Sequence, residues 1–158
     1  MKYNFIFQLS NGIYGFTPWG KIYLDRLKSL ISESMLNIGI VEMCLPSLSN
    51  IDIWKYRTNH EKFISNQYCF PPTSEEIVCK LLDENKIQND IFFQFSKNFR
   101  DEVRPQFGLC RTKEFIMKDG YGYFDNIEES KKWLDKVNKS YIEFFNSINI
   151  QIEGLSVY

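Results

Sequence analysis

The residues best suited to chemistry lie in one basic stretch, from Phe99 to Asp119. Arginines that flank the loop of a β-hairpin can point together at one anion, because the planar guanidinium matches phosphate and carboxylate oxygens. Phe115 offers a flat face on which a base could stack, and Glu102 could accept a hydrogen bond from a ligand amine. The stretch therefore indicates a pocket for a nucleotide phosphate. Its basic residues are Arg100, Arg104, Arg111, Lys113 and Lys118.

An ordinary charged hairpin explains the same composition. Asp101, Glu102 and Glu114 could pair with the basic side chains, and charge clusters of this kind are usually solvated faces. Composition alone favours the charged hairpin, and it is the order of the residues that changes this interpretation.

Residues 99–119 read Phe-Arg-Asp-Glu-Val-Arg-Pro-Gln-Phe-Gly-Leu-Cys-Arg-Thr-Lys-Glu-Phe-Ile-Met-Lys-Asp. This string resembles motif 2 of class II aminoacyl-tRNA synthetases, in the version found in prolyl-tRNA synthetases. The resemblance implies that Arg100 is the catalytic residue, which holds the ATP α-phosphate and the amino-acid carboxylate. It places Glu102 at the adenine end of ATP, Arg111 on the γ-phosphate and Phe115 against adenine. Such chemistry depends on positioning and charge stabilisation.

The same resemblance implies further ligands. The loop from Val103 to Cys110, with Arg104 and Gln106, would approach the acceptor end of tRNA(Pro). Mg²⁺ would arrive with ATP, and no metal ligand is identified among the protein side chains.

Residues 70–76, Phe-Pro-Pro-Thr-Ser-Glu-Glu, resemble the P-T-x-E-E segment of that family. The resemblance implies that Thr73 and Glu75 bind the ammonium group of the amino acid, with Arg100 at its carboxylate. Thr73 and Glu76 also have the spacing of a capping box at the start of a helix. The two interpretations are compatible, because Glu75 is not needed for the box.

The resemblance extends toward both ends of the chain. Residues 9–20, Leu-Ser-Asn-Gly-Ile-Tyr-Gly-Phe-Thr-Pro-Trp-Gly, look like the family's L-A-S-G-I-Y-x-x-L-P-L-G. Residues 20–46 resemble motif 1, which builds the dimer interface in the family and ends at Pro46. Residues 118–124 correspond to the family's K-D-A-Y-S-F.

The spacing of apolar residues predicts the elements that position these segments. We expect helices packed on one side of a mostly antiparallel sheet, an α+β layout. The two strands around the basic stretch should be antiparallel and joined by a long loop. The predicted helices are Gly20–Ile38, a second from Thr73, and Ile127–Ser147 capped by Asn126. The predicted strands are Ile40–Leu45, Gln67–Phe70, Asp90–Asn98, Glu114–Met117 and Ile150–Leu155, with a helical turn over Asn50–Tyr56.

Composition excludes several classes of protein. The 158 residues suit one domain, and 44% hydrophobic content supplies a core. A net charge of −1 argues against a generally basic nucleic-acid binder, and no apolar run is long enough to span a membrane. Four dispersed cysteines and the single His60, read as a surface residue, predict no zinc site. They fit reduced, partly buried thiols in a cytoplasmic protein.

The resemblance implies one incomplete catalytic domain over residues 1–158, a partial class II synthetase core with a mostly antiparallel sheet and flanking helices. We expect motif 3, an editing domain and an anticodon-binding domain to be absent. Half a sheet leaves an open edge. We therefore expect a homodimer through the motif 1-like segment, or a second polypeptide that completes the domain.

Three functions fit these observations. The first is the catalytic portion of a proline–tRNA ligase, a fragment or part of a split enzyme, which activates proline with ATP and transfers it to tRNA. The second is a synthetase-like paralogue that binds nucleotide, tRNA or a partner without catalysis. The third is an enzyme that activates an amino acid for an acceptor other than tRNA.

Overall fold

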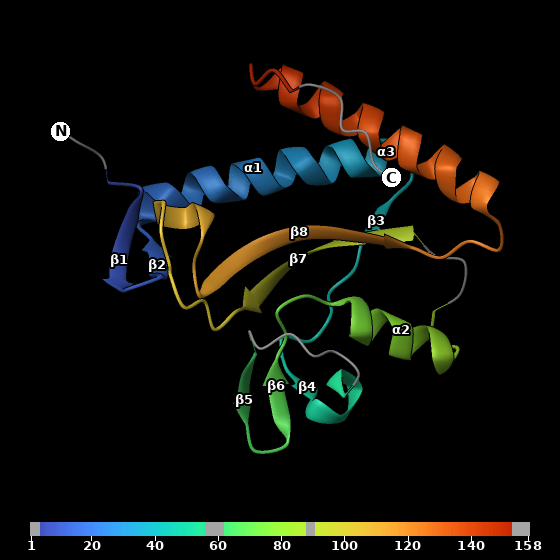
Figure 1. Ribbon diagram of the computed structural model, residues 1–158. Coiled ribbons are helices and arrows are strands. Elements are labelled where there is room, and N and C mark those ends of the chain that lie inside the picture. Colours follow the sequence, from blue (N-terminus) through green and yellow to red (C-terminus); the bar gives the residue numbers. More distant parts are fainter. Residues whose placement is uncertain (1–3, 56–61, 88–90, 153–158) are drawn as a thin grey trace.

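A computed structural model describes residues 4–55, 62–87 and 91–152 of the chain. Within these residues there are three α-helices and three small β-sheets; the helices flank the central sheet, while β1-β2 lies at the left of Figure 1 and β4-β6-β5 lies at the bottom. The elements in chain order are β1 (Ile6–Ser10), β2 (Ile13–Phe16), α1 (Pro18–Asn37), β3 (Val41–Glu42), β4 (Ser49–Asn50), a 3₁₀ turn (Ile51–Trp54), β5 (Phe63–Ser65), β6 (Tyr68–Phe70), α2 (Glu75–Asp83), β7 (Ile91–Phe99), a 3₁₀ turn (Gly108–Cys110), β8 (Glu114–Gly122) and α3 (Ile127–Ser147).

The central sheet has the order β3-β7-β8. Strands β7 and β8 are antiparallel over their full length, from the pair Ile91–Gly122 to the pair Phe99–Glu114. The short β3 joins β7 in parallel. The predicted antiparallel pair is confirmed, and β8 runs five residues beyond the predicted end at Met117.

Helices cover both faces of this sheet, so the prediction of helices on one side is wrong. Figure 1 shows α1 and α3 above β7 and β8, and α2 below them. Phe93 packs with Met35 of α1 on the upper face, whereas Phe92 packs with Ile77 and Val78 of α2 on the lower face. Because β7 carries apolar residues on both faces, each face needs its own cover.

Helices α1 and α3 lie against each other through small polar residues as well as apolar ones. The Ser34 and Ser140 hydroxyls lie 2.8 Å apart, and Ser140 is buried. Apolar side chains of α3, including Trp133 and Val137, pack toward the cluster around Phe93. Close approach of the two helices therefore covers the upper face of the sheet.

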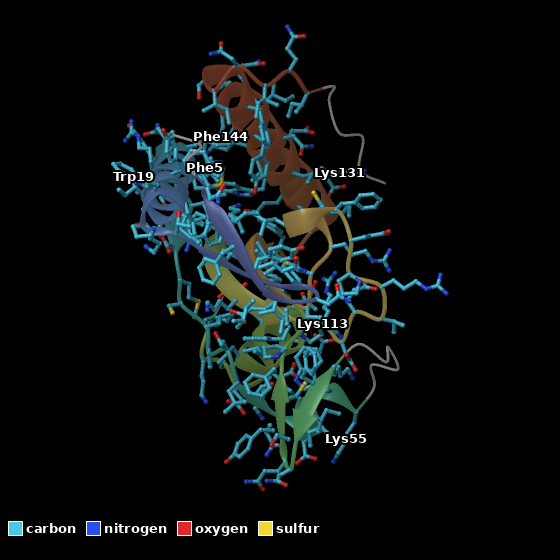
Figure 2. All side chains as sticks on the ribbon, turned by 90° about the vertical axis from the view of Figure 1, so that its left-hand side faces the viewer. Phe5, Trp19, Lys55, Lys113, Lys131 and Phe144 are labelled. Carbon is cyan, nitrogen blue, oxygen red and sulfur yellow. The ribbon has the colours of Figure 1, made fainter. Side chains whose placement is uncertain are left out.

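The chain opens with a hairpin that our sequence reasoning missed. Strands β1 and β2 pair antiparallel around Asn11 and Gly12, and Gly12 has a φ of +76°. Asn-Gly between two apolar runs is a strong hairpin signal, because both turn residues accept positive φ. Figure 2 shows this hairpin beside Phe5 and Trp19, at the start of α1. Of the three strands in the sheet β4-β6-β5, only β6 was predicted.

The helix ends follow from local signals. Helix α1 has Thr17 as its N-cap, whose side chain accepts a hydrogen bond from the Gly20 amide at 3.2 Å, and Gly39 follows its end with a φ of +84°. Helix α3 has the predicted bounds, and Asn126 Oδ1 accepts from the Glu129 amide at 2.8 Å.

Other predictions fare unevenly. The strand predicted at Ile40–Leu45 is confirmed only over the two residues of β3. Residues 150–152 form no strand, and the rest of the predicted Ile150–Leu155 strand lies outside the described residues, as does His60. Of the four cysteines, all free thiols, only Cys69 is buried. No described helix is long and apolar enough to span a membrane.

Candidate functional site

The loop between β7 and β8 is closed by backbone hydrogen bonds. The Arg100 amide donates to the Lys113 carbonyl at 2.8 Å, and the Gln106 amide donates to the Arg111 carbonyl at 3.1 Å. The loop base is therefore fixed to the strands, and its first residue, Arg100, is held at the end of β7.

Arg100 is the cation at the centre of the predicted site. Its Nε donates to the Pro72 carbonyl at 3.4 Å, and its guanidinium carbon lies 5.0 Å from the centre of the Phe115 ring. No carboxylate among the described residues forms an ion pair with it. A guanidinium stacked on an aromatic ring, without a carboxylate partner, is available to an anionic ligand.

Glu102 and Arg111 are brought together as an ion pair at the base of the loop. Arg111 Nε lies 2.7 Å from Glu102 Oε2, and the Arg104 amide donates to Glu102 Oε1 at 2.9 Å. The hydrogen bond from Arg111, followed by that from the Arg104 amide, lowers the pKa of Glu102 below its usual value. Glu102 is therefore a carboxylate acceptor at neutral pH.

The predicted capping box at Thr73 is wrong. Helix α2 begins at Glu75 with Ser74 as its N-cap, and no side chain caps it. Thr73 Oγ1 instead donates to Glu75 Oε2. The Ser74 hydroxyl accepts a hydrogen bond from the Gln94 side chain at 2.8 Å, which takes it away from the helix. Thr73 and Glu75, the predicted amino-acid ligands, are thus in direct contact.

A polar cluster on β8 and β7 completes this end of the site, and our sequence reasoning missed it. The Tyr121 hydroxyl donates to Asp119 Oδ2 at 2.6 Å, and the Ser96 hydroxyl donates to Asp119 Oδ1 at 3.4 Å. Burial, and then the bond to Asp119, raises the pKa of Tyr121 above its usual value. Strand alternation could have revealed this cluster, because Asp119 and Tyr121 lie on the same face of β8 as Phe115.

The site therefore has two ends with opposite charge. Arg100, whose guanidinium lies over the Phe115 ring, forms the cationic end. Thr73, Glu75 and the Asp119 cluster form the anionic end. Phe115 and Asp119 are four positions apart on β8, which is about 13 Å along an extended strand. A ligand with an anionic group and an ammonium group at opposite positions would match this arrangement.

A small cavity lies beside Glu75, between α2 and the end of β8. Its volume is about 190 Å³ and its walls are mostly apolar. The lining residues include Val78, Leu82, Phe92 and Tyr121. A small apolar group next to an ammonium would fit here.

Lys118 and Lys113 do not belong to the phosphate pocket to which the sequence assigned them. Lys118 points to the opposite face of β8, where it contacts the Tyr141 hydroxyl and Met35 Sδ. Burial lowers the pKa of Lys118 to about 8. Lys113 pairs with Asp101 at 2.9 Å. The charged-hairpin interpretation therefore holds for Lys113, and for Arg111 with Glu102, but not for Arg100.

The tip of the loop is exposed and carries the predicted tRNA-contacting residues, Arg104 and Gln106. Phe107 and Gly108 both adopt positive φ there. The β1–β2 turn supports the loop, since the Lys113 amide donates to the Gly12 carbonyl at 2.8 Å. A Cβ atom on Gly12 would lie 2.7 Å from the Pro105 ring, so the contact requires glycine.

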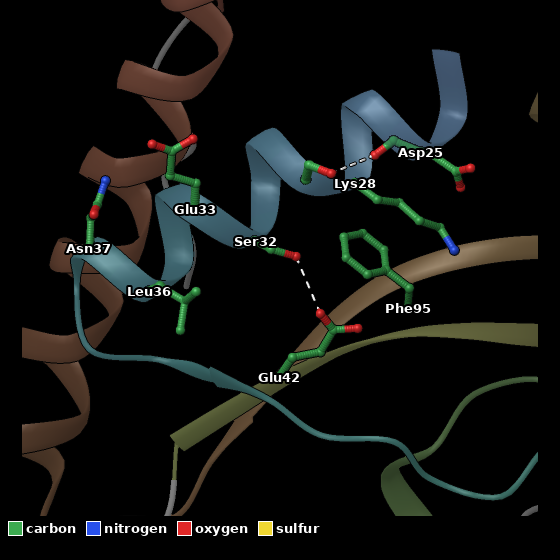
Figure 3. A pocket seen from close by; sticks show the side chains of 9 residues that line it. Asp25, Lys28, Ser32, Glu33, Leu36, Asn37, Glu42 and Phe95 are labelled. Atoms are coloured by element: carbon green, nitrogen blue, oxygen red, sulfur yellow. Dashed lines mark hydrogen bonds between the residues drawn. The ribbon is translucent and has the colours of Figure 1, made fainter. Parts of the chain in front are cut away.

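A second hollow lies elsewhere, along the outer side of α1. Figure 3 shows Ser32 of α1 pointing at Glu42, to which it donates a hydrogen bond, and the Lys28 side chain beside Phe95, whereas Glu33 points away from them. No residue predicted for the site lines this groove. Among the described residues, no cluster of three or more His, Cys, Asp or Glu side chains could hold a metal ion.

Comparison with known proteins places this geometry in a family. The model of the tRNA synthetase class II core domain (G, H, P, S and T) matches residues 56–157, more than half of the chain. Among curated proteins, the proline–tRNA ligase of Chlamydia muridarum is 31% identical over 166 residues, which cover 95% of this chain and 29% of that protein. The proline–tRNA ligase of Prochlorococcus marinus (strain AS9601) is 28% identical over 172 residues, which cover 98% of this chain and 29% of that protein. The chain thus spans less than a third of the length of these relatives.

Solved structures agree on the fold. A Giardia lamblia prolyl-tRNA synthetase in complex with prolyl-adenylate superposes with a TM-score of 0.78 at 18% identity, covering 88% of this chain and 32% of that one. A Cryptosporidium parvum prolyl-tRNA synthetase complexed with L-proline and AMP gives a TM-score of 0.77 at 16% identity, covering 90% of this chain and 31% of that chain.

Proposed function

The chain belongs to the class II tRNA synthetase core-domain family, and from that premise we propose that it is the proline-activating portion of a proline–tRNA ligase. The reaction joins proline to ATP as prolyl-adenylate and then transfers the prolyl group to tRNA(Pro). The proposal covers residues 1–158 as one part of a catalytic domain that carries the motif 1-like and motif 2-like segments. The similarity to proline–tRNA ligases along nearly the whole chain supports it.

The observation that carries the proposal is the pair of oppositely charged ends on one face of the sheet. Arg100 is stacked on Phe115 at one end, and Thr73 with Glu75 lies at the other. The adenylate requires both, because its phosphate is anionic and the amino group of the amino acid is cationic. The small apolar cavity beside Glu75 is suited to the ring of proline.

In this proposal, Arg100 performs the charge stabilisation. One carboxylate oxygen of proline attacks the α-phosphorus of ATP, the bond to the β-phosphate oxygen breaks, and pyrophosphate leaves. Negative charge grows on the α-phosphate during this step, next to the guanidinium. A fixed donor at such a position contributes roughly 10²–10³ in rate. No side-chain nucleophile is needed.

The remaining residues hold ATP. We assign Phe115 to stacking on adenine, Glu102 to accepting the adenine amine and Arg111 to the γ-phosphate. The lowered pKa of Glu102 supports an acceptor role. Mg²⁺ would bind through the phosphates of ATP.

Transfer to tRNA would use the exposed loop, with Arg104 and Gln106 near the acceptor end. A hydroxyl of the terminal ribose would attack the prolyl carbonyl, and AMP would leave. Exposure of the loop tip supports contact with a large partner, since Val103 is 86% exposed and Phe107 76% exposed.

We further propose that a second surface completes the domain. The outer side of the hairpin and α1 exposes large apolar residues that suit a homodimer contact: Phe7, Leu9, Trp19, Ile22 and Tyr23. The outer edge of β8 has no partner strand among the described residues, which suits further strands of the core or a second polypeptide. Free thiols fit the cytoplasmic location that we also propose.

The test is proline-dependent exchange of pyrophosphate into ATP, measured with the chain in the presence of a polypeptide that supplies the rest of the core. Exchange, followed by transfer to tRNA(Pro), is the expected result. Exchange without transfer to tRNA would point to another acceptor. Nucleotide binding without exchange would reject catalysis and favour the binding paralogue.

A further inference from the structure

Gln94 is a buried amide that joins three segments of the chain. It lies within β7 and is 1% exposed. Its Oε1 accepts from the Leu45 amide at 3.2 Å. Its Nε2 donates to Ser74 Oγ at 2.8 Å and to Asp119 Oδ2 at 3.1 Å. One side chain therefore connects the segment after β3, the start of α2 and the middle of β8.

These three contacts meet at the anionic end of the site. Ser74 stands between Thr73 and Glu75, and Asp119 is the acceptor of the Tyr121 hydroxyl. The position of Gln94 thus decides how far the start of α2 lies from β8. The two carboxylates of this end, Glu75 and Asp119, come from those two elements.

We propose that Gln94 is a positioning residue for the amino-acid end of the site. It holds the start of α2 against Asp119 and ties both to the segment that follows α1 and β3. Gln94 touches no substrate in this role and acts through Ser74 and Asp119. The inference rests on the proposed function, because it takes Glu75 as an amino-acid ligand.

The simplest alternative is that Gln94 only fills space in the interior. Methionine has nearly the same length and volume but makes none of the three hydrogen bonds. If Gln94 is only a filler, Gln94→Met changes little. If it positions the site, the substitution leaves the Leu45 amide without its acceptor and the Ser74 hydroxyl without its donor, and such buried groups are costly to leave unpaired.

Asn98 provides a matched control on the same strand and the same face. It is fully buried, and neither of its side-chain polar atoms has a hydrogen-bond partner among the described residues. Leucine has the branching of asparagine, so Asn98→Leu replaces a buried amide without removing a hydrogen bond. Gln94→Met therefore removes three hydrogen bonds between segments, whereas Asn98→Leu removes none.

The first measurement is amide hydrogen exchange of the full chain. With Gln94→Met we expect the Leu45 and Val78 amides to exchange at least tenfold faster, while the β7–β8 pairing stays protected. Val78 reports the start of α2, because its amide donates to the Ser74 carbonyl at 3.0 Å. Asn98→Leu should leave both amides unchanged. Unchanged Leu45 and Val78 amides in Gln94→Met would overturn the proposal.

A second variant separates the two halves of the connection. Gln94→Glu keeps an oxygen for the Leu45 amide but replaces the amide donor with a carboxylate oxygen, which repels the Asp119 carboxylate at this buried position. We expect Leu45 to keep its protection and Val78 to lose it. Loss at both amides, or at neither, would contradict the assignment. This variant also decides the question if Gln94→Met does not fold.

The second measurement is kinetic, on the chain completed as in the exchange assay above. We expect Gln94→Met to raise KM for proline at least tenfold and to change KM for ATP less than twofold, since Arg100 and Phe115 lie at the other end. Equal changes in both constants would overturn the positioning role. If the wild-type protein shows no exchange with proline, the proposed function fails, while the amide measurements still decide whether Gln94 holds the segments together.

Discussion

The two faces of the β7–β8 ribbon come from the same two strands and serve different purposes. The upper face places Phe93 and Phe95 against α1 and α3, so its task is packing. The lower face carries Gln94, Ser96 and Asp119 in one hydrogen-bonded network beside the start of α2. Neighbouring residues of one strand therefore serve different purposes, because their side chains point to opposite faces of the sheet.

The difference teaches how one ribbon can carry an apolar face and a face on which a polar network lies beside the packed Phe92. On the upper face, removal of a side chain leaves a cavity, and the cost appears in stability. On the lower face, removal of a side chain unpairs a partner or a ligand, and the cost should appear mainly in activity. Variants on each face can test this separation.

The largest effect on stability should come from the upper face. Phe93 is fully buried at the meeting point of α1, α3 and β7. Phe93→Ala should lower the free energy of unfolding by about 3–5 kcal/mol, through lost burial and an unfilled cavity. Urea unfolding followed by circular dichroism measures this change. A loss below 1 kcal/mol would show that this face is not the main core.

The largest effect on activity should come from the lower face. Arg100→Lys keeps the positive charge but loses the planar fork and its stacking on Phe115. Proline-dependent exchange should fall about 10²-fold, with little change in unfolding. Lys97→Ala is the control, because Lys97 lies on the other face, exposed and paired with Glu114 at 2.8 Å. Equal losses in the two variants would argue against a special role for Arg100.

A smaller effect should come from the contact that supports the loop. Gly12→Ala would place Cβ 2.7 Å from Pro105 at a residue whose φ is +76°. We expect a loss of about 1–2 kcal/mol in stability and faster amide exchange at Lys113. Gly108→Ala is informative beside it, since Gly108 also has positive φ but a Cβ there would meet no atom within 4 Å. If the Lys113 amide exchanges at a similar rate in both variants, backbone strain at positive φ, and not the lost contact with Pro105, explains the effect of Gly12→Ala.

The smallest effect should come from Lys118, the charged residue on the packing face. Burial lowers its pKa to about 8, so the unfolded chain binds more protons between pH 8 and its ordinary value of 10.5. Stability should therefore rise with pH across this window, by on the order of 1 kcal/mol after allowance for partial exposure. Lys118→Met should abolish the slope and raise Tm at pH 7. A slope that persists in this variant would assign it to another group.

The sequence predicts the parts of this molecule that local patterns determine. Helix α3 was placed to the residue because Asn126 is a strong cap and the apolar spacing is regular. The antiparallel pair around the basic stretch was also predicted. Arg100 and Phe115, predicted to share a ligand, are in contact. Their roles in binding ATP and proline stay predictions.

The errors arise where distant residues decide the outcome. Thr73 has the local pattern of a cap, but Gln94 occupies the Ser74 hydroxyl and the helix begins at Glu75. Lys118 belongs to the basic stretch by sequence, yet strand alternation puts it on the opposite face. The Asp119–Tyr121 cluster needs the strand register to be recognised.

The contact between Ser34 of α1 and Ser140 of α3 joins residues 106 positions apart. During synthesis, α1 leaves the ribosome long before its partner helix exists. The apolar stripe that will cover Phe93 must then stay uncovered while the intervening chain is translated. Contacts of such long range form slowly and leave intermediates prone to association. Nascent chains that end before α3 should therefore be bound by chaperones, and release should follow the emergence of α3.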